Sequence, residues 1–165
     1  MITRNKYNYY FYTFLSILVF ILLLKADMSL SISYKEALNV FVNNSVLSFI
    51  TKTSIYFFGQ NDIGLRFPFI LFYALSVLLM YKLTDNYFRY EKDRFIAICI
   101  FMILPGVLSA SLLVNSAIMV TFLTLLYLYY YQINNKHSYG LLIFFLFVDN
   151  SFAILFLGLL FFSLK

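Results

Sequence analysis

Long stretches of apolar residues without a charge constrain this chain more than any other feature. The first stretch, residues 7–24, holds no charged residue and ends at Lys25. About 20 apolar residues of helix cross the hydrocarbon core of a bilayer, so this stretch predicts a membrane-spanning helix. We therefore expect an all-α polytopic membrane protein with about five to six transmembrane helices. Further stretches of this kind cover residues 67–83, 95–113, 117–131 and 139–164.

The composition supports a lipid environment. Hydrophobic residues make up 63% of the chain and charged residues only 12%, against roughly 45–50% and 25% in soluble domains. The net charge is +5, but the basic residues lie mostly at the edges of apolar stretches. The expected partner is therefore the lipid bilayer and not a nucleic acid. Cys99 stands alone in an apolar stretch and His137 in a polar connector, so no disulfide, metal site or cofactor is predicted.

The basic residues also predict an orientation in the membrane. The N-terminal tail, the connectors 84–94 and 132–138 and the C-terminus carry most of the net positive charge. Basic segments favour the cytoplasmic side, so these segments are expected inside. The segment 26–66 carries little net charge and is expected outside. The chain is predicted to be integral to the bacterial inner (cytoplasmic) membrane, with a retained N-terminal anchor and a cytoplasmic N-terminus.

The external segment 26–66 predicts two short amphipathic helices, over about 34–43 and 46–58, with Gly59 ending the second. Such helices lie in the plane of the membrane interface with their apolar faces toward the lipid. Ser33 and Glu36 form an S-x-x-E pattern, which is typical of a helix capping box.

Prolines and polar residues interrupt the apolar stretches at three places. Pro68 is expected in the first turn of the helix 67–83, where its missing N–H costs little. Pro105 is expected to kink or end the helix over 95–113. Asp149, Asn150 and Ser151 leave two interpretations of residues 139–164: one long helix with a buried carboxylate, or two short helices that meet at a turn. The shortness of the two parts favours the turn.

One segment resembles a known enzyme family. Residues 56–84, YFFGQNDIGLRFPFILFYALSVLLMYKLT, are similar to a recurring segment of membrane glycosyltransferases that use polyprenyl-phosphate sugars. These are GT-C fold enzymes of the protein-mannosyltransferase and aminoarabinose-transferase type. Gly59, Arg66 and Pro68 fall into the pattern that leads from the first external loop into the second span. The resemblance implies the N-terminal membrane region of an enzyme that moves a sugar from a lipid-linked donor to an acceptor outside the membrane.

The resemblance also implies candidate site residues. The family has an Asp-Glu pair early in the external loop, and Glu36 takes the place of the Glu. Lys35 stands where the Asp is expected, and a lysine is protonated near neutral pH. The implied catalytic carboxylates are therefore Glu36 and the earlier Asp27. One of them would act as the general base that takes the proton of the acceptor. Arg66 and Lys52 are the cations implied to hold the leaving phosphate.

Other interpretations compete with this one. Glu36 serves as a helix cap whatever else it does. The composition also fits a small non-catalytic membrane protein, such as an assembly or scaffold subunit. It fits a transporter fragment as well, in which Asp149 would be the charged residue within the membrane. The family has a further acid after the third span, where this chain has Asn115 and Ser116. Enzymes of the family are also longer, so we expect an N-terminal part or a shortened product that holds half a site and is inactive alone.

Overall fold

The computed structural model describes residues 2–28, 32–42, 45–134 and 136–163, and every regular element in them is helical. This confirms the predicted all-α class. In chain order the elements are α1 (Ile2–Met28), α2 (Tyr34–Ala37), the π-helix η1 (Leu38–Val42), α3 (Val46–Phe58), α4 (Asp62–Leu83), the 3-10 helix η2 (Thr84–Asn86), α5 (Glu91–Ile103), α6 (Pro105–Leu112), α7 (Ala117–Asn134), α8 (Tyr139–Leu146) and α9 (Phe152–Ser163).

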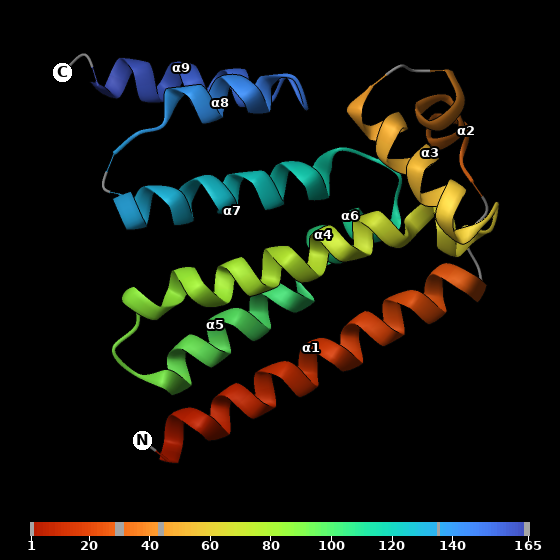
Figure 1. Ribbon diagram of the computed structural model, residues 1–165. Coiled ribbons are helices and arrows are strands. Elements are labelled where there is room, and N and C mark those ends of the chain that lie inside the picture. The colour runs from red at the N-terminus through yellow and green to blue at the C-terminus, as the bar shows by residue number, and fades with distance from the viewer. Residues whose placement is uncertain (1, 29–31, 43–44, 135, 164–165) are drawn as a thin grey trace.

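Helix α4 is the centre of the bundle. It packs against α1, α3, α5, α6 and α7, and these helices surround it on several sides (Figure 1). Its side chains Phe69, Tyr73 and Val77 are fully buried, and the Tyr73 hydroxyl donates to the Met102 carbonyl of α5 at 2.9 Å. A helix that is apolar on most of its circumference is expected inside a bundle. The α8–α9 pair instead lies at the edge, beside α7.

The structure does not confirm the predicted number of spanning segments. Among the described residues two helices are long and apolar enough to cross a membrane, Lys6–Met28 and Asp62–Asn86. A third span results if α5 and α6, which are bent by 47° at Pro105, count as one. The polytopic helical class is thus confirmed, whereas the expected count of five to six spans is not. Pro105 is the first residue of α6, in agreement with the predicted break in the helix.

The position predicted for Pro68 was wrong. Helix α4 begins at Asp62, earlier than expected, so Pro68 lies inside the helix and not in its first turn. A proline inside a helix cannot donate to the carbonyl four residues before it, here that of Gly64. The hydroxyl of Ser54 from α3 donates to that carbonyl instead, at 2.6 Å. A partner from a neighbouring helix therefore replaces the hydrogen bond that the proline removes.

Two glycines allow α3 and α4 to meet closely. Gly59, which ends α3 as predicted, has a φ of +85°, in the region that favours glycine. A Cβ atom on Gly64 would lie only 2.4 Å from the Gly59 carbonyl oxygen. Any side chain at position 64 would push the two backbones apart, so the joint between α3 and α4 requires glycine there.

Residues 139–163 form two helices, as the turn interpretation predicted. Between α8 and α9, one carboxylate oxygen of Asp149 accepts hydrogen bonds from the Ser151 N–H at 2.8 Å and the Ser151 hydroxyl at 2.5 Å. These bonds fix the turn, so Asp149 lies between the helices and not within one. Lys165 lies outside the described residues.

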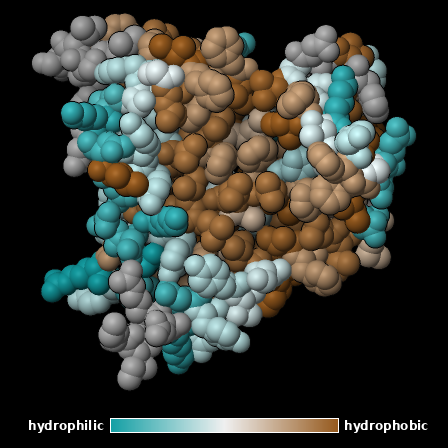
Figure 2. All heavy atoms as spheres, viewed as in Figure 1, coloured by the Kyte–Doolittle hydropathy of each residue, from teal (hydrophilic) through white to brown (hydrophobic). Residues whose placement is uncertain are grey.

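The bundle has two polar ends. The start of α1 and the α4–α5 and α7–α8 connectors lie at one end, which we call the inner end (Figure 1). The segment with α2 and α3 and the α6–α7 link lie at the other, which we call the outer end. Figure 2 shows hydrophobic residues gathered over the middle of the visible face and hydrophilic ones toward its two sides. This distribution is the one expected of a protein that crosses a bilayer.

Candidate functional site

Glu36 closes the capping box that its sequence predicted. Its backbone N–H donates to the Ser33 hydroxyl at 3.3 Å, and its carboxylate oxygen Oε2 accepts from the Ser33 N–H at 2.9 Å. Both bonds satisfy N–H groups that the start of a helix leaves without partners. Because α2 has a single turn before the π-helix η1, these two bonds contribute much of its local stability.

The other carboxylate oxygen of Glu36 holds a distant part of the chain. Oε1 accepts a hydrogen bond from the Val114 N–H at 2.9 Å, across 78 positions of sequence. The side chain is only 5% exposed. We call residues 112–116, which connect α6 to α7, the outer link. Glu36 thus joins the segment between α1 and α3 to the outer link, a contact that the sequence did not reveal.

Arg66 reaches the same outer link from α4. Its Nε donates to the Leu112 carbonyl at 2.9 Å, and the residue is fully buried. One guanidinium nitrogen lies 3.5 Å from a carboxylate oxygen of Asp62, one helical turn earlier. A buried charge is tolerated only when it is paired and hydrogen-bonded, and these contacts meet that condition. The Arg66 side chain is therefore inaccessible to solvent and links Asp62 to the outer link.

Electrostatics keep Glu36 ionised. Burial raises the pKa of its carboxyl, but hydrogen bonds from Val114 and Ser33 and the charge of Arg66 outweigh burial, and the pKa lies below its ordinary value of 4.5. A general base works best when its pKa is near the working pH. Both oxygens of Glu36 accept hydrogen bonds from backbone N–H groups, and its pKa is lowered. Such a carboxylate is better suited to a structural role than to that of a general base.

A second carboxylate meets the outer link from the α8–α9 turn. Asp149 accepts a hydrogen bond from the Ser116 side chain, and the neighbouring Asn115 accepts from the Ala117 N–H at 3.1 Å. Burial raises the pKa of Asp149, but the bonds from Ser116 and Ser151 lower it overall. The positions where the family has a further acid thus carry side chains that organise the start of α7.

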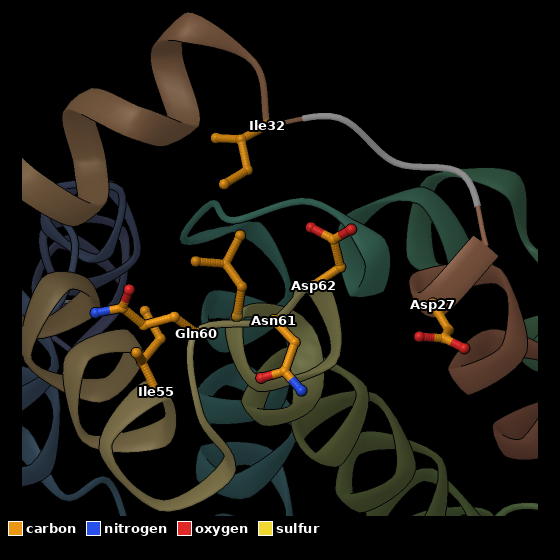
Figure 3. A pocket seen from close by; sticks show the side chains of 7 residues that line it. Asp27, Ile32, Ile55, Gln60, Asn61 and Asp62 are labelled. Carbon is orange, nitrogen blue, oxygen red and sulfur yellow. The ribbon is translucent and has the colours of Figure 1, made fainter.

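Asp27 borders a cleft at the outer end. The cleft has a volume of about 370 Å³ and lies between the end of α1 and the joint of α3 with α4 (Figure 3). Asp27 is exposed, and Asp62, which pairs with Arg66, borders the same cleft. Pockets of this size with a few polar groups are typical binding sites for small ligands. The remaining lining residues are Ile32, Ile55, Gln60, Asn61 and Leu65.

Lys52 lies elsewhere on the outer end. It is exposed on α3 and borders a shallow groove of about 280 Å³ together with Ser45, Ser48 and Phe49. The structure therefore brings Glu36 and Arg66 together at the outer link, and it places Asp27 and Lys52 in two separate hollows. The side chain of Lys35 is outside the described part of the chain.

The sequence did not single out the polar lining of the cleft. None of Gln60, Asn61 and Asp62 was a predicted site residue. They border the cleft because Gly59 ends α3 and turns the chain into α4. Within the described residues, no group of three His, Cys, Asp or Glu side chains is placed to hold a metal ion.

Comparison with known families agrees with the resemblance of residues 56–84. The family model described as dolichyl-phosphate-mannose-protein mannosyltransferase matches residues 45–162, well over half of the chain. The matched part includes Lys52 and Arg66 but neither Asp27 nor Glu36. No curated protein and no solved structure matches the chain. By this match and its apolar helices, the chain is an integral membrane protein that belongs to the dolichyl-phosphate-mannose-protein mannosyltransferase family.

Proposed function

We propose that this chain is the membrane region of a glycosyltransferase that moves a sugar from a polyprenyl-phosphate donor to an acceptor outside the membrane. The observation that carries this proposal is the family match, which extends from the start of α3 nearly to the end of α9. The enzyme would lie in the bacterial inner membrane. Its outer end, with the cleft and the groove, would then hold the reaction.

The distribution of charge supports this orientation. Lys82, Arg89, Lys92 and Arg94 lie in or beside the α4–α5 connector, and the α7–α8 connector at the same end contains Lys136. Basic residues next to spans favour the cytoplasmic side. With the inner end in the cytoplasm, the N-terminus is cytoplasmic and the outer end faces the external side.

Asp27 is the acid best suited to be the general base. It is exposed on an open cleft where an acceptor hydroxyl would have access to it, whereas Glu36 is buried with both oxygens engaged. In the proposed step the proton of the acceptor hydroxyl passes to Asp27. At the same time the hydroxyl oxygen forms a bond to the anomeric carbon of the donor sugar. The bond from that carbon to the donor phosphate breaks, and the phosphate leaves with the electron pair.

Lys52 is the cation proposed to hold the lipid-linked donor at the membrane surface, because its groove is separate from the cleft of Asp27. Its side chain is exposed on α3, next to the predicted membrane surface where a lipid-linked phosphate would lie. Glu36 and Arg66 act in this proposal as positioning residues, because both are buried and hold the outer link.

The test uses the protein in membranes supplied with polyprenyl-phosphate mannose, the kind of donor that the family description names. Asp27→Asn is expected to lower sugar transfer by about 10²–10⁴-fold, the usual contribution of a general base. Asp93→Asn removes an exposed carboxylate at the start of α5, at the inner end, and serves as the matched control with unchanged transfer. Normal transfer by Asp27→Asn would remove Asp27 from the reaction.

A second candidate function is a non-catalytic membrane subunit. It is favoured by the contacts of Glu36, which are those of a structural residue, and by the lysine at position 35. In that case membranes that contain the chain transfer no sugar, and Asp27→Asn and Lys52→Ala leave its cellular function intact. Loss of that function in either variant would argue for the enzyme.

A further inference from the structure

A polar pocket at the inner end takes no part in the proposed reaction. It has a volume of about 470 Å³ and lies at the opposite end of the bundle from the cleft and the groove (Figure 1). Its polar lining includes Asn8 of α1, Lys82 of α4, Asn86 of η2, Arg94 of α5 and Tyr129 of α7. A pocket to which several elements contribute polar groups is the usual place for a ligand. We call it the inner pocket.

The inner pocket lies where two spans reach the membrane boundary. Asn8 is close to the start of the candidate span Lys6–Met28, and Lys82 is close to the end of the other, Asp62–Asn86. Apolar residues dominate both spans beyond these two positions, toward the middle of the bundle. The boundary between headgroups and hydrocarbon therefore passes near the pocket. A lipid of the adjacent leaflet can place its headgroup there while its acyl chains remain in the bilayer.

Hydrogen-bond donors around the inner pocket are available to a ligand. Lys82 is exposed, and no carboxylate of the described residues pairs with it; its ammonium nitrogen lies 5.8 Å from the centroid of the Tyr129 ring. Within the same part of the chain, no residue forms a hydrogen bond with the Asn86 side chain or the Tyr129 hydroxyl. The Tyr81 hydroxyl donates to the side-chain oxygen of Asn8, which leaves the Asn8 amide nitrogen as a donor. Four elements thus present donors to one space.

The charge of the inner pocket selects among acceptor ligands. Arg94 also lines the pocket, but its guanidinium pairs with Asp85 at 2.7 Å and with Glu91 at 3.3 Å. Among the described lining residues, Lys82 is therefore the cation that remains for a ligand. A phosphodiester carries a single negative charge, whereas a phosphomonoester carries about −1.5 to −2 at neutral pH. The phosphodiester thus matches the charge of one ammonium group, and its oxygens can accept from the donors.

The inner pocket also offers acceptors for the rest of a headgroup. Gln132 donates through Nε2 to the Leu83 carbonyl at 3.3 Å, so its side-chain oxygen remains as an acceptor. The Asp85 side chain, which lines the same pocket, is 41% exposed. Hydroxyl groups next to a bound phosphate would find acceptors there. The combination of donors and acceptors favours a phosphodiester of glycerol over bare phosphate.

We propose that the inner pocket binds the phosphodiester of a glycerol-bearing headgroup, with Lys82 paired to the phosphate and Asn8 and Asn86 as further donors. Basic pockets between membrane spans bind phospholipid headgroups in this way. A membrane phospholipid and a water-soluble glycerophosphodiester offer the same chemistry, and the test separates these two sources. The proposal does not depend on sugar transfer, because the site lies at the other end of the bundle.

Binding is measured on the complete chain in detergent by native mass spectrometry. The probes are phosphatidylglycerol, its deacylated form glycerophosphoglycerol, and inorganic phosphate. Lys82→Gln removes the charge that pairs with the phosphate, whereas Lys82→Arg keeps it. Asn8→Ala removes a donor that comes from α1. Lys92→Gln is the matched control, because Lys92 is exposed at the same end but does not line the pocket.

The wild type should bind one phosphatidylglycerol, and Lys82→Gln should bind it roughly tenfold more weakly, as expected for the loss of a hydrogen bond between charged groups. Asn8→Ala should weaken binding several-fold, while Lys82→Arg and Lys92→Gln should bind like the wild type. Competition by glycerophosphoglycerol at similar concentration would assign the pocket to a soluble phosphodiester, and failure to compete would assign it to the lipid. Equal binding by Lys82→Gln and Lys92→Gln, or equally strong binding of inorganic phosphate, would overturn the proposal.

Discussion

Two buried arginines, one at each end of the bundle, are held in different ways. At the inner end Arg94 donates to the Asp85 carboxylate and the Tyr81 carbonyl, both at 2.7 Å, from no more than 13 positions away. At the outer end Arg66 donates to the Leu112 carbonyl, 46 positions away. Arg94 therefore fixes the connector in which it lies, whereas Arg66 ties together segments that meet only when the chain folds.

The partners of the two arginines differ as well. The Arg94 guanidinium lies over the Tyr81 ring at 4.1 Å and has two carboxylates, Asp85 and Glu91, that remain partly exposed to water. Arg66 interacts with the outer link, to which Glu36 also binds with a buried carboxylate. Water can replace much of what Arg94 does, but it has little access to the side chains of Glu36 and Arg66. The outer end should therefore be the more sensitive to mutation.

The largest effect is expected for Arg66→Met. It leaves Glu36 buried without the nearby positive charge and removes the donor to the Leu112 carbonyl. Removing one partner of a buried charged pair costs about 3–5 kcal/mol, so the free energy of unfolding should fall by that amount. Unfolding by SDS in mixed micelles measures it. Arg66→Lys keeps the charge and should lose less. A loss no greater than that of Arg94→Met would show that the two ends are equally robust.

An intermediate effect is expected for Glu36→Gln. It replaces a charged acceptor of two backbone hydrogen bonds, which contribute about 1.5–3 kcal/mol to the free energy of unfolding. The pKa of Glu36 is lower in the folded state than its ordinary 4.5, so the folded state binds this proton less readily than the unfolded state. The stabilisation is thus complete above the ordinary pKa, and it is lost as the pH falls through the folded pKa.

Unfolding of the wild type and of Glu36→Gln, measured from about pH 6 to about pH 3, should therefore converge as the pH falls. Asp93→Asn is the matched control, since its carboxylate is exposed at the inner end. A constant difference between wild type and Glu36→Gln over this range would mean that the charge of Glu36 contributes nothing to the outer link.

The smallest effect is expected for Arg94→Met. Its carboxylate partners are partly exposed, and a methionine still packs on the Tyr81 ring, so the loss in unfolding free energy should be about 1 kcal/mol. Hydrogen exchange should increase in the α4–α5 connector and not at the outer link. Increased exchange at residues 112–116 would contradict the view that Arg94 acts only locally.

Local patterns predicted the parts of the fold that depend on neighbouring residues. The capping box of Ser33 and Glu36, the end of α3 at Gly59 and the turn at Asp149 are all present. Pro68 was misplaced because its accommodation depends on Ser54 from another helix. The cleft could not be predicted either, because its lining residues come from the end of α1, the end of α3 and the start of α4.

The sequence alone determined that this protein resides in a lipid bilayer, that it is helical and which family it resembles. These properties follow from long apolar stretches and short motifs, which are local features of the chain. Only the tertiary structure decided what the second carboxylate oxygen of Glu36 does. Its carboxylate caps α2 with one oxygen and holds Val114 with the other. The second contact exists because packing around α4 brings the outer link against the segment between α1 and α3, and hydrophobic packing does not depend on distance along the sequence.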